Sequence, residues 1–210
     1  AIAQNLLEKG VEKILTGGVV ANIFLIASGI DIGKPSTEFI QKQIPEHDKI
    51  ISLANDLLRK HGERIQIPTD VALNIDGKRV DVNISQLPTE YQIFDIGVQS
   101  TVTVSSEIKS AGTIILNGPA GVFELNEFKF GTFSIINACA ESEAFVVVGG
   151  GHTATLINNL GLSKKIGHVS TGGGACLEFL AGNKLSGVES LEISAKRFGL
   201  TIKKLQRELQ

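Results

Sequence analysis

The 210-residue chain lacks methionine, has only two cysteines and contains no run of basic residues. A net charge of −2 without a basic patch argues against a nucleic-acid-binding surface. The longest apolar stretch, residues 19–27, is too short to cross a membrane and is interrupted by Asn22. We therefore expect neither nucleic acid nor a membrane among the partners of this chain.

The two cysteines, Cys139 and Cys176, lack the close paired spacing that metal sites require, and no histidine pair has helical ligand spacing. The sequence therefore predicts no resident metal, and the low cysteine count favours a reducing, cytoplasmic compartment. Without a methionine, the chain opens on residues typical of a helix interior. This opening favours a piece of a longer protein.

Glycine, by contrast, is abundant: the chain has 23, above the usual share of about 7%. Two segments, 144–154 and 166–175, repeat one pattern, in which an apolar strand runs into three glycines and then a helix. Such turns let a ligand approach the backbone closely and direct free N–H groups at it. The helix dipole favours an anion at the same place, so the pattern predicts two phosphate-binding turns.

Predicted strands and helices alternate along the chain, which favours an α/β fold of the Rossmann-like, three-layer type, with a mostly parallel central sheet and helices on both faces. Asp76-Gly77 is a hairpin turn signal, and Ser36 is a candidate N-cap. The expected helices cover 1–9, 18–27, 36–62 with a break at Pro45, 100–111, 126–140 and 187–210, and the expected strands cover 13–16, 64–73, 78–84, 92–97 and 113–117.

Other nucleotide and hydrolase motifs fit poorly. The segment 29–35 imitates a P-loop but is one residue short and lacks the Ser or Thr after its lysine. Residues 149–154 satisfy the G-x-G-x-x-A fingerprint of dinucleotide-binding folds, yet no Asp or Glu lies between Ala154 and Glu178 to bind a ribose. A nucleotide- or dinucleotide-binding module without kinase activity therefore stays open as an alternative function for this chain. The G-x-S-x-G nucleophile elbow of α/β-hydrolases is absent.

The combination of segments is more specific than any one of them. Residues 117–124 (NGPAGVFE), 149–154 (GGGHTA) and 168–178 (HVSTGGGACLE) resemble phosphoglycerate kinase in order and spacing. Gly17-Gly18 before an apolar helix, residues 32–36 and 67–70, and the strand ending at 95–97 resemble the same family. The likeness covers essentially the whole chain but only the nucleotide-binding half of the two-domain enzyme, and it is closest to the archaeal branch.

The resemblance implies a role for each glycine-bearing segment. An adenine slot would be lined by Gly17, Gly18 and Gly97 and continued by Asn117, Pro119 and Val122, with Glu124 binding the ribose. The phosphate chain of ATP or ADP, with Mg²⁺, would be held by Gly150, Gly151, His152 and Thr153. The phosphoryl group in transit would meet Gly172, Gly173 and Gly174, which we interpret as the catalytic residues.

The same likeness sets the domain boundaries and the expected activity. Residues 1–186 would be the ATP/ADP-binding lobe and 187–210 a C-terminal helical tail, while the N-terminal lobe that binds 3-phosphoglycerate is absent. The parent reaction would move a phosphoryl group between ATP and 3-phosphoglycerate, in glycolysis or gluconeogenesis. The family usually has Asp where this chain has His152, and its phosphate-neutralising lysines would precede residue 1. We therefore expect the chain alone to bind nucleotide without turnover.

Overall fold

The computed structural model describes residues 2–170, 172 and 174–198. Its helices are α1 (Ile2–Glu8), α2 (Gly18–Ala27), α3 (Lys34–Gln43), α4 (His47–His61), α5 (Val98–Ser110), α6 (Phe130–Glu141), α7 (Gly151–Asn159), α8 (Gly174–Leu180) and α9 (Ser186–Arg197). Its strands are β1 (Ile14–Leu15), β2 (Ile65–Gln66), β3 (Asp70–Ile75), β4 (Lys78–Asn83), β5 (Gln92–Ile96), β6 (Thr113–Asn117), β7 (Phe145–Gly149) and β8 (His168–Val169).

The α/β class with parallel strands flanked by helices is confirmed. Strands β6, β7 and β8 form a parallel ladder in that order, and β1 pairs in parallel with β2. The described strands form three separate ladders rather than one continuous sheet, and one of them, with β3 between β4 and β5, is antiparallel. That ladder arises because a hairpin needs no crossover helix, whereas parallel neighbours do.

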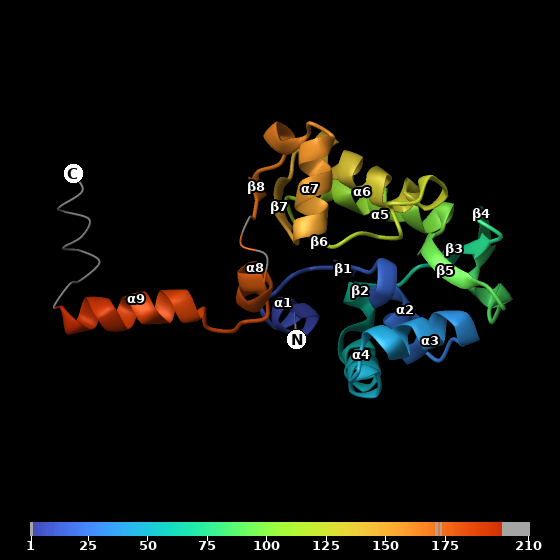
Figure 1. Cartoon of the computed structure of the whole chain (residues 1–210), viewed down its shortest axis with the longest axis horizontal. Coiled ribbons are helices and arrows are strands. Elements are labelled where there is room, and N and C mark those ends of the chain that lie inside the picture. The colour runs from blue at the N-terminus through green and yellow to red at the C-terminus, as the bar shows by residue number, and fades with distance from the viewer. Residues whose placement is uncertain (1, 171, 173, 199–210) are drawn as a thin grey trace.

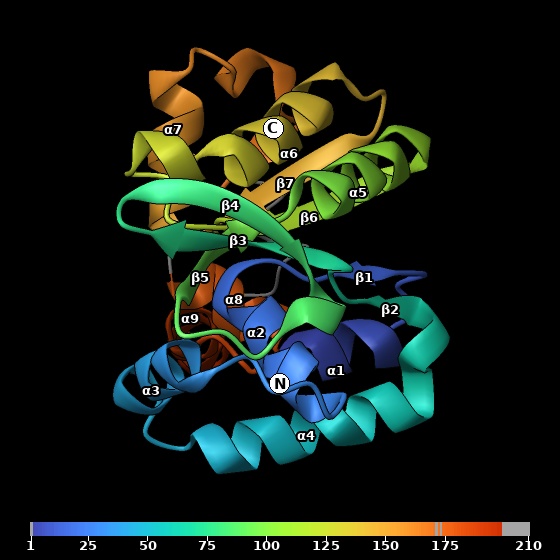
Figure 2. The same cartoon turned by 90° about the vertical axis from the view of Figure 1, so that its right-hand side faces the viewer.

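The hairpin between β3 and β4 turns where the sequence predicts. Asp76 and Gly77 both have positive φ, 50° and 82°, the conformation that matches the twist of a two-residue hairpin. In Figure 2 the hairpin arches between the part of the molecule formed by α5, α6 and α7 and the part formed by α1–α4. Strand β3 is buried along its first four residues, while four of the six residues of β4 are exposed.

The prediction that Ser36 caps a helix is wrong. Helix α3 begins at Lys34 after Gly33, and Pro35 occupies its first turn, where the fixed φ of proline suits a helix. Ser36 is instead buried, and its Oγ accepts a hydrogen bond from the Ile93 N–H at 3.0 Å. The hydroxyl thus joins α3 to β5.

Other element boundaries shift by a few residues. The break at Pro45 is confirmed as the gap between α3 and α4. Helix α5 starts at Val98, two residues before the predicted start, and the predicted helix 126–140 divides into a 3₁₀ turn (Asn126–Phe128) and α6. The predicted tail helix 187–210 corresponds in its first part to α9, which ends at Arg197. Residues 199–210 lie outside the described part of the chain.

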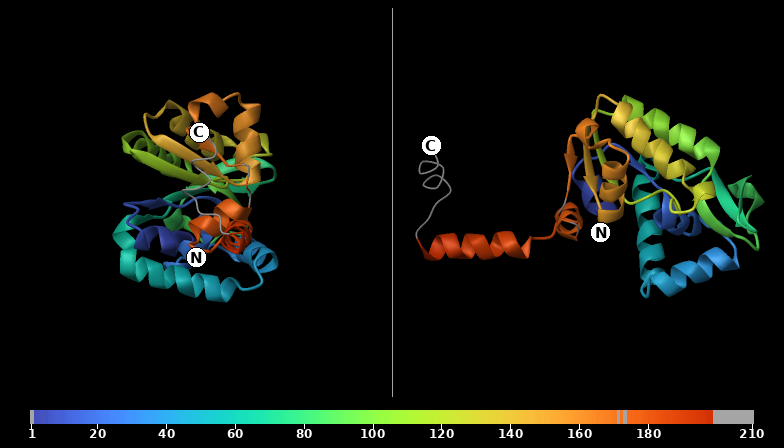
Figure 3. Two further views of the ribbon diagram at one scale, coloured as in Figure 1. Left: turned by 90° about the vertical axis from the view of Figure 1, so that its left-hand side faces the viewer. Right: turned by 45° about the horizontal axis from the view of Figure 1, so that its top comes forward.

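Two apolar cores underlie these elements. One contains Leu25, Ile32 and Leu73 and joins α2–α4 to β3, and the other contains Val146, Val148 and Ile157 beneath β7 and α7. Helices α5, α6 and α7 gather around the β6–β8 ladder in Figure 1. Helix α9 extends away from the rest of the molecule in Figures 1 and 3. No helix among the described residues has the length and apolar character of a membrane span.

Candidate functional site

The carboxyl ends of β6, β7 and β8 lie at one edge of their parallel ladder. Asn117 at the end of β6 pairs in register with Gly149 at the end of β7, and Val148 pairs with Val169. Parallel strands share one carboxyl edge, where open α/β sheets bind ligands. The ladder therefore brings together three predicted ligand segments that are separated in the sequence: 117–124, 149–153 and the segment after β8, of which Ser170, Gly172 and Gly174 are described.

The turn from β7 into α7 has the geometry of an anion site. Gly150 is the N-cap, with a φ of 88° that favours glycine, and no side chain caps the helix. The first N–H groups of an α-helix have no partner within the helix, and the helix dipole is positive at this end. The first turn also carries no acidic residue. The exposed His152 is its second residue.

Thr153 lies in this first turn with its hydroxyl buried. The residue is 2% exposed, and its Oγ1 has no hydrogen-bond partner among the described residues. A buried hydroxyl without a partner costs about 1–3 kcal/mol. Among the described residues, the Thr153 Oγ1 is the one buried side-chain polar atom without a hydrogen-bond partner. It belongs to a residue that we predicted to bind phosphate.

Neighbouring side chains pack against the same turn without filling it. A Cβ placed at Gly149 would lie 3.1 Å from the Asn117 Oδ1 and 3.2 Å from the Cys176 Sγ, so a side chain there would crowd both. Cys176 belongs to α8, which starts at Gly174. The ends of β6 and β7 and the start of α8 thus meet at one place.

The third glycine turn is described only in part. The Gly172 N–H donates to the Ser170 Oγ at 3.3 Å, and the Ala175 N–H donates to the Gly172 carbonyl at 2.9 Å. Gly172 and Gly174 are exposed, whereas Gly173 lies outside the described residues. The far end of α8 is held by α1, because the Asn5 Nδ2 donates to the Leu180 carbonyl at 2.7 Å.

The loop after β6 has a different character, because the N–H groups of residues 120–123 are already bonded within the chain. The Thr132 Oγ1 accepts from the N–H groups of Ala120 and Gly121 at 3.1 and 3.3 Å, and the Val122 N–H donates to the Phe94 carbonyl at 2.8 Å. This loop can form a wall for a flat ring, but it cannot cradle a phosphate as the α7 turn can.

The predicted slot residues Gly17 and Gly18 lie against this loop. The Gly18 N–H donates to the Ala120 carbonyl at 2.8 Å, and a Cβ at Gly18 would lie 2.8 Å from the Pro119 carbonyl oxygen. A Cβ at Gly17 would lie 3.3 Å from the Ala120 Cβ. Farther along the same loop, Val122 is 36% exposed and Glu124 is also exposed.

Sequence reasoning assigned no role to the charged residues behind the loop. Asp95 and Arg79 form a buried ion pair there, with 2.8 Å between Oδ2 and Nη1. Burial raises the pKa of Asp95, although Arg79 and the N–H groups of Gly131 and Ile96 favour its ionised form. Burial lowers the pKa of Arg79, but Asp81 and Asp95 outweigh it and raise the pKa overall. The available signal was an acidic residue inside an apolar strand.

The described residues include no group of three or more His, Cys, Asp or Glu side chains arranged to hold a metal ion. Mg²⁺ prefers oxygen ligands, and the imidazole of His152 is a poor substitute for a carboxylate. The residues at the α7 turn therefore do not fit a magnesium site made by the chain itself.

The chain matches one family of known proteins along most of its length. The family model described as phosphoglycerate kinase matches residues 1–183. The chain is 45% identical over 197 residues to the phosphoglycerate kinase of Methanothermus fervidus, which covers 93% of this chain and 47% of that protein. It is 42% identical over 199 residues to that of Thermoplasma acidophilum, covering 94% and 48%. The chain thus spans about half the length of the curated relatives it matches.

Solved structures give the same result. The crystal structure of phosphoglycerate kinase from Pyrococcus horikoshii OT3 matches with a TM-score of 0.84 and 36% identity, over 93% of this chain and 49% of that one. The structure from Coxiella burnetii matches with a TM-score of 0.75 and 34% identity, over 87% and 47%.

Proposed function

The chain belongs to the phosphoglycerate kinase family, and from this we propose that it binds ADP and ATP as the nucleotide-binding half of such a kinase. The family assignment predicted from the glycine segments is confirmed by these matches. Since the chain covers about half of its relatives, the reaction between ATP and 3-phosphoglycerate is proposed for a whole enzyme that contains this half. A cytoplasmic location is part of the same proposal.

The observation that carries the proposal is the uncapped start of α7. Gly150 and Gly151 leave backbone N–H groups without a side-chain cap, and the Thr153 hydroxyl lacks a partner. A phosphate group supplies acceptors for both and complements the dipole. We assign this turn to the phosphate chain.

The base and ribose would then lie along the loop after β6. Gly17, Gly18 and Pro119 present backbone and small side chains there, which suits a flat ring. We assign Gly97, Asn117 and Val122 to the same wall and Glu124 to the ribose hydroxyls. None of these side chains supplies a nucleophile, in keeping with phosphoryl transfer, where positioning and charge stabilisation carry the catalysis.

The phosphoryl group in transit would meet Gly172, Gly173 and Gly174, which follow the neighbouring strand β8. Backbone N–H groups at such a turn can stabilise charge that develops on the transferred group. Mg²⁺ would reach this chain bound to the nucleotide phosphates, since the described residues offer no carboxylate set for it. The 3-phosphoglycerate would be bound by the other half of the enzyme.

Calorimetry with ADP, ATP and NAD, alongside a coupled kinase assay, tests this assignment. We expect ADP and ATP to bind more tightly than NAD, with no phosphoryl transfer to 3-phosphoglycerate by this chain alone. Tighter binding of NAD would favour the dinucleotide-binding alternative, which the family matches do not favour. Measurable turnover would show that the second half is dispensable.

A further inference from the structure

An ion pair lies buried behind the loop that we assign to the adenine base. The Asp95 side chain is 0% exposed and that of Arg79 is 12% exposed. The Arg79 guanidinium also contacts Asp81 through two nitrogens, at 2.9 and 3.0 Å, and donates to the Ile96 carbonyl at 2.8 Å. These bonds connect Arg79 on β4 to β5. Because the planar guanidinium makes several of them at once, its orientation is fixed.

Asp95 also contacts helix α6, the next residue of its own strand and the loop itself. Its Oδ2 accepts from the Gly131 N–H, in the first turn of α6, at 2.8 Å, and its Oδ1 accepts from the Ile96 N–H at 2.9 Å. A Cβ at Gly121 would overlap the Asp95 Oδ1 and lie 2.5 Å from the Phe94 carbonyl oxygen. The loop therefore rests directly on the Asp95 carboxylate.

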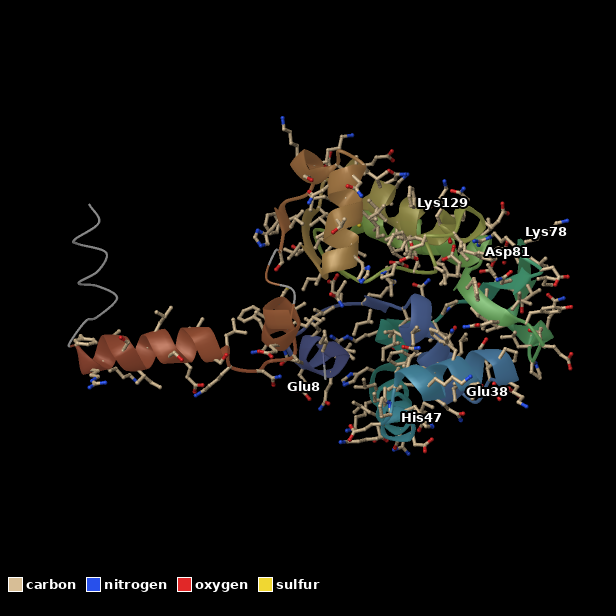
Figure 4. All side chains as sticks on the ribbon, in the orientation of Figure 1. Glu8, Glu38, His47, Lys78, Asp81 and Lys129 are labelled. Atoms are coloured by element: carbon tan, nitrogen blue, oxygen red, sulfur yellow. The ribbon has the colours of Figure 1, made fainter. Side chains whose placement is uncertain are left out.

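Asp81 extends the same network to α5. Its Oδ1 accepts from the Val98 N–H, the first N–H of that helix, at 3.0 Å. Figure 4 shows Asp81 at the same end of the molecule as Lys129, which directly precedes α6. The starts of α5 and α6 and the loop thus all contact one network of charges, Asp81 and Arg79 on β4 and Asp95 on β5.

A buried ion pair adds little net stability, because the loss of hydration offsets the attraction between the charges. It does fix the distance and orientation of whatever is bonded to it. We propose that Asp95 and Arg79 are positioning residues, which hold the 118–122 loop against Gly17 and Gly18 and so set the affinity for the adenine base. The inference rests on the proposed nucleotide-binding function.

The α7 turn is positioned by the pairing of β7 with β6 and β8 rather than by this network of charges. None of the described hydrogen bonds of Arg79, Asp81 or Asp95 reaches residues 149–153. Weakening the network should therefore reduce recognition of the base while leaving recognition of phosphate intact. A general loss of folding would reduce both alike.

The test compares ADP with inorganic pyrophosphate, which lacks the base, by calorimetry on the parent chain and on Asp95→Asn. A shift of about 1 Å in a ligand-contacting group can cost up to about a hundredfold. We expect ADP to bind about tenfold more weakly to Asp95→Asn, with pyrophosphate affinity changed less than about twofold. Equal weakening of both ligands, or no change in either, would overturn the inference.

A second variant guards against misfolding of Asp95→Asn. Gly121→Ala keeps the ion pair but pushes the loop off the carboxylate, and it should show the same selective loss of ADP. Gly112→Ala is the matched control, since a Cβ there has nothing within 4 Å, and it should bind both ligands as the parent does. A parent chain that binds pyrophosphate as tightly as ADP would refute the proposed function itself. A parent that prefers ADP, with variants that keep this preference, would refute only the positioning role.

Discussion

The Asp70 carboxylate caps helix α5 from a neighbouring strand by accepting two hydrogen bonds from Ser100. Its Oδ1 lies 2.7 Å from the Ser100 N and 2.5 Å from the Ser100 Oγ, while its Oδ2 accepts from the Gln99 N–H at 2.9 Å. A Cβ at Gly97 would overlap this carboxylate. The close approach of Asp70 therefore explains why residue 97 is a glycine. The predicted contact of Gly97 with the adenine base stays a prediction.

Asp70→Ala should lower the free energy of unfolding by about 1–3 kcal/mol, because the start of α5 loses its cap at a buried site. Urea unfolding of the parent and the variant measures the change. Asp56→Ala is the control, since Asp56 forms only an exposed ion pair with Arg59 and should cost less than about 1 kcal/mol. Equal losses in the two variants would contradict the capping role.

Glu124→Ala should weaken ADP binding by about 1–3 kcal/mol, the scale of a hydrogen bond to a charged group. Calorimetry with ADP and with 2′,3′-dideoxy-ADP isolates the ribose hydroxyls, and the loss should appear only with ADP. Glu127→Ala removes a nearby exposed carboxylate and should change neither ligand. If Glu124→Ala discriminates between the two nucleotides as strongly as the parent, Glu124 is not the ribose partner.

His152→Asp should bind metal-free ADP about tenfold more weakly and depend more strongly on added Mg²⁺, because a carboxylate repels phosphate unless a cation bridges them. Asn159→Asp, at the other end of α7, adds a comparable charge away from the site. Unchanged metal-free affinity in His152→Asp would rule out a phosphate contact.

The two cysteines should react at very different rates in the folded protein. Burial raises the pKa of the Cys139 thiol to about 11, so the reactive thiolate is scarce at neutral pH, whereas Cys176 is only half-buried. Iodoacetamide followed by mass spectrometry should label Cys176 first, and ADP should slow that labelling, because Cys176 packs against Gly149. Both cysteines should react in urea. If ADP leaves the labelling rate of Cys176 unchanged, the nucleotide does not bind next to α8.

Asp95 should make the stability of the chain depend on acid pH. Burial raises its pKa above the ordinary 3.8, so the folded protein binds this proton more tightly than the unfolded chain. The stability that this proton contributes is fully present when the pH is below the ordinary pKa of Asp95. It is lost as the pH rises through the pKa that Asp95 has in the folded protein. The unfolding free energy of the parent minus that of Asp95→Asn should therefore fall as the pH rises from the ordinary pKa to the folded pKa of Asp95, and then level off.

Arg79→Gln provides the comparison for this titration. Without the guanidinium, the ionised carboxylate is less favoured, so the decline in stability should extend to higher pH than in the parent. Urea unfolding at a series of pH values, from the acid range to neutrality, follows both variants. Parallel stability curves for the parent and Asp95→Asn would show that Asp95 does not titrate differently in the folded state.

Features that depend on neighbours in the sequence were predictable. The Asp76-Gly77 turn and the glycine turn before α7 follow from local backbone preferences. The pattern of strand, glycine turn and helix also predicts that the glycine turns lie at the carboxyl ends of their strands, whereas the pairing of Asn117 with Gly149 came from the structure. The family and the α/β class could be inferred from these segments alone.

The sequence by itself thus determined the turns, the alternation of elements and the edge at which a nucleotide would bind, since each depends on short-range chemistry. Only the tertiary structure decided which distant residues hold that edge in place. Thr132 fixes the loop at Ala120, Asp70 caps α5, and Arg79 pairs with Asp95. The reason is physical: a buried hydroxyl or carboxylate needs a partner, and the partner is chosen by packing between segments that sequence spacing does not relate.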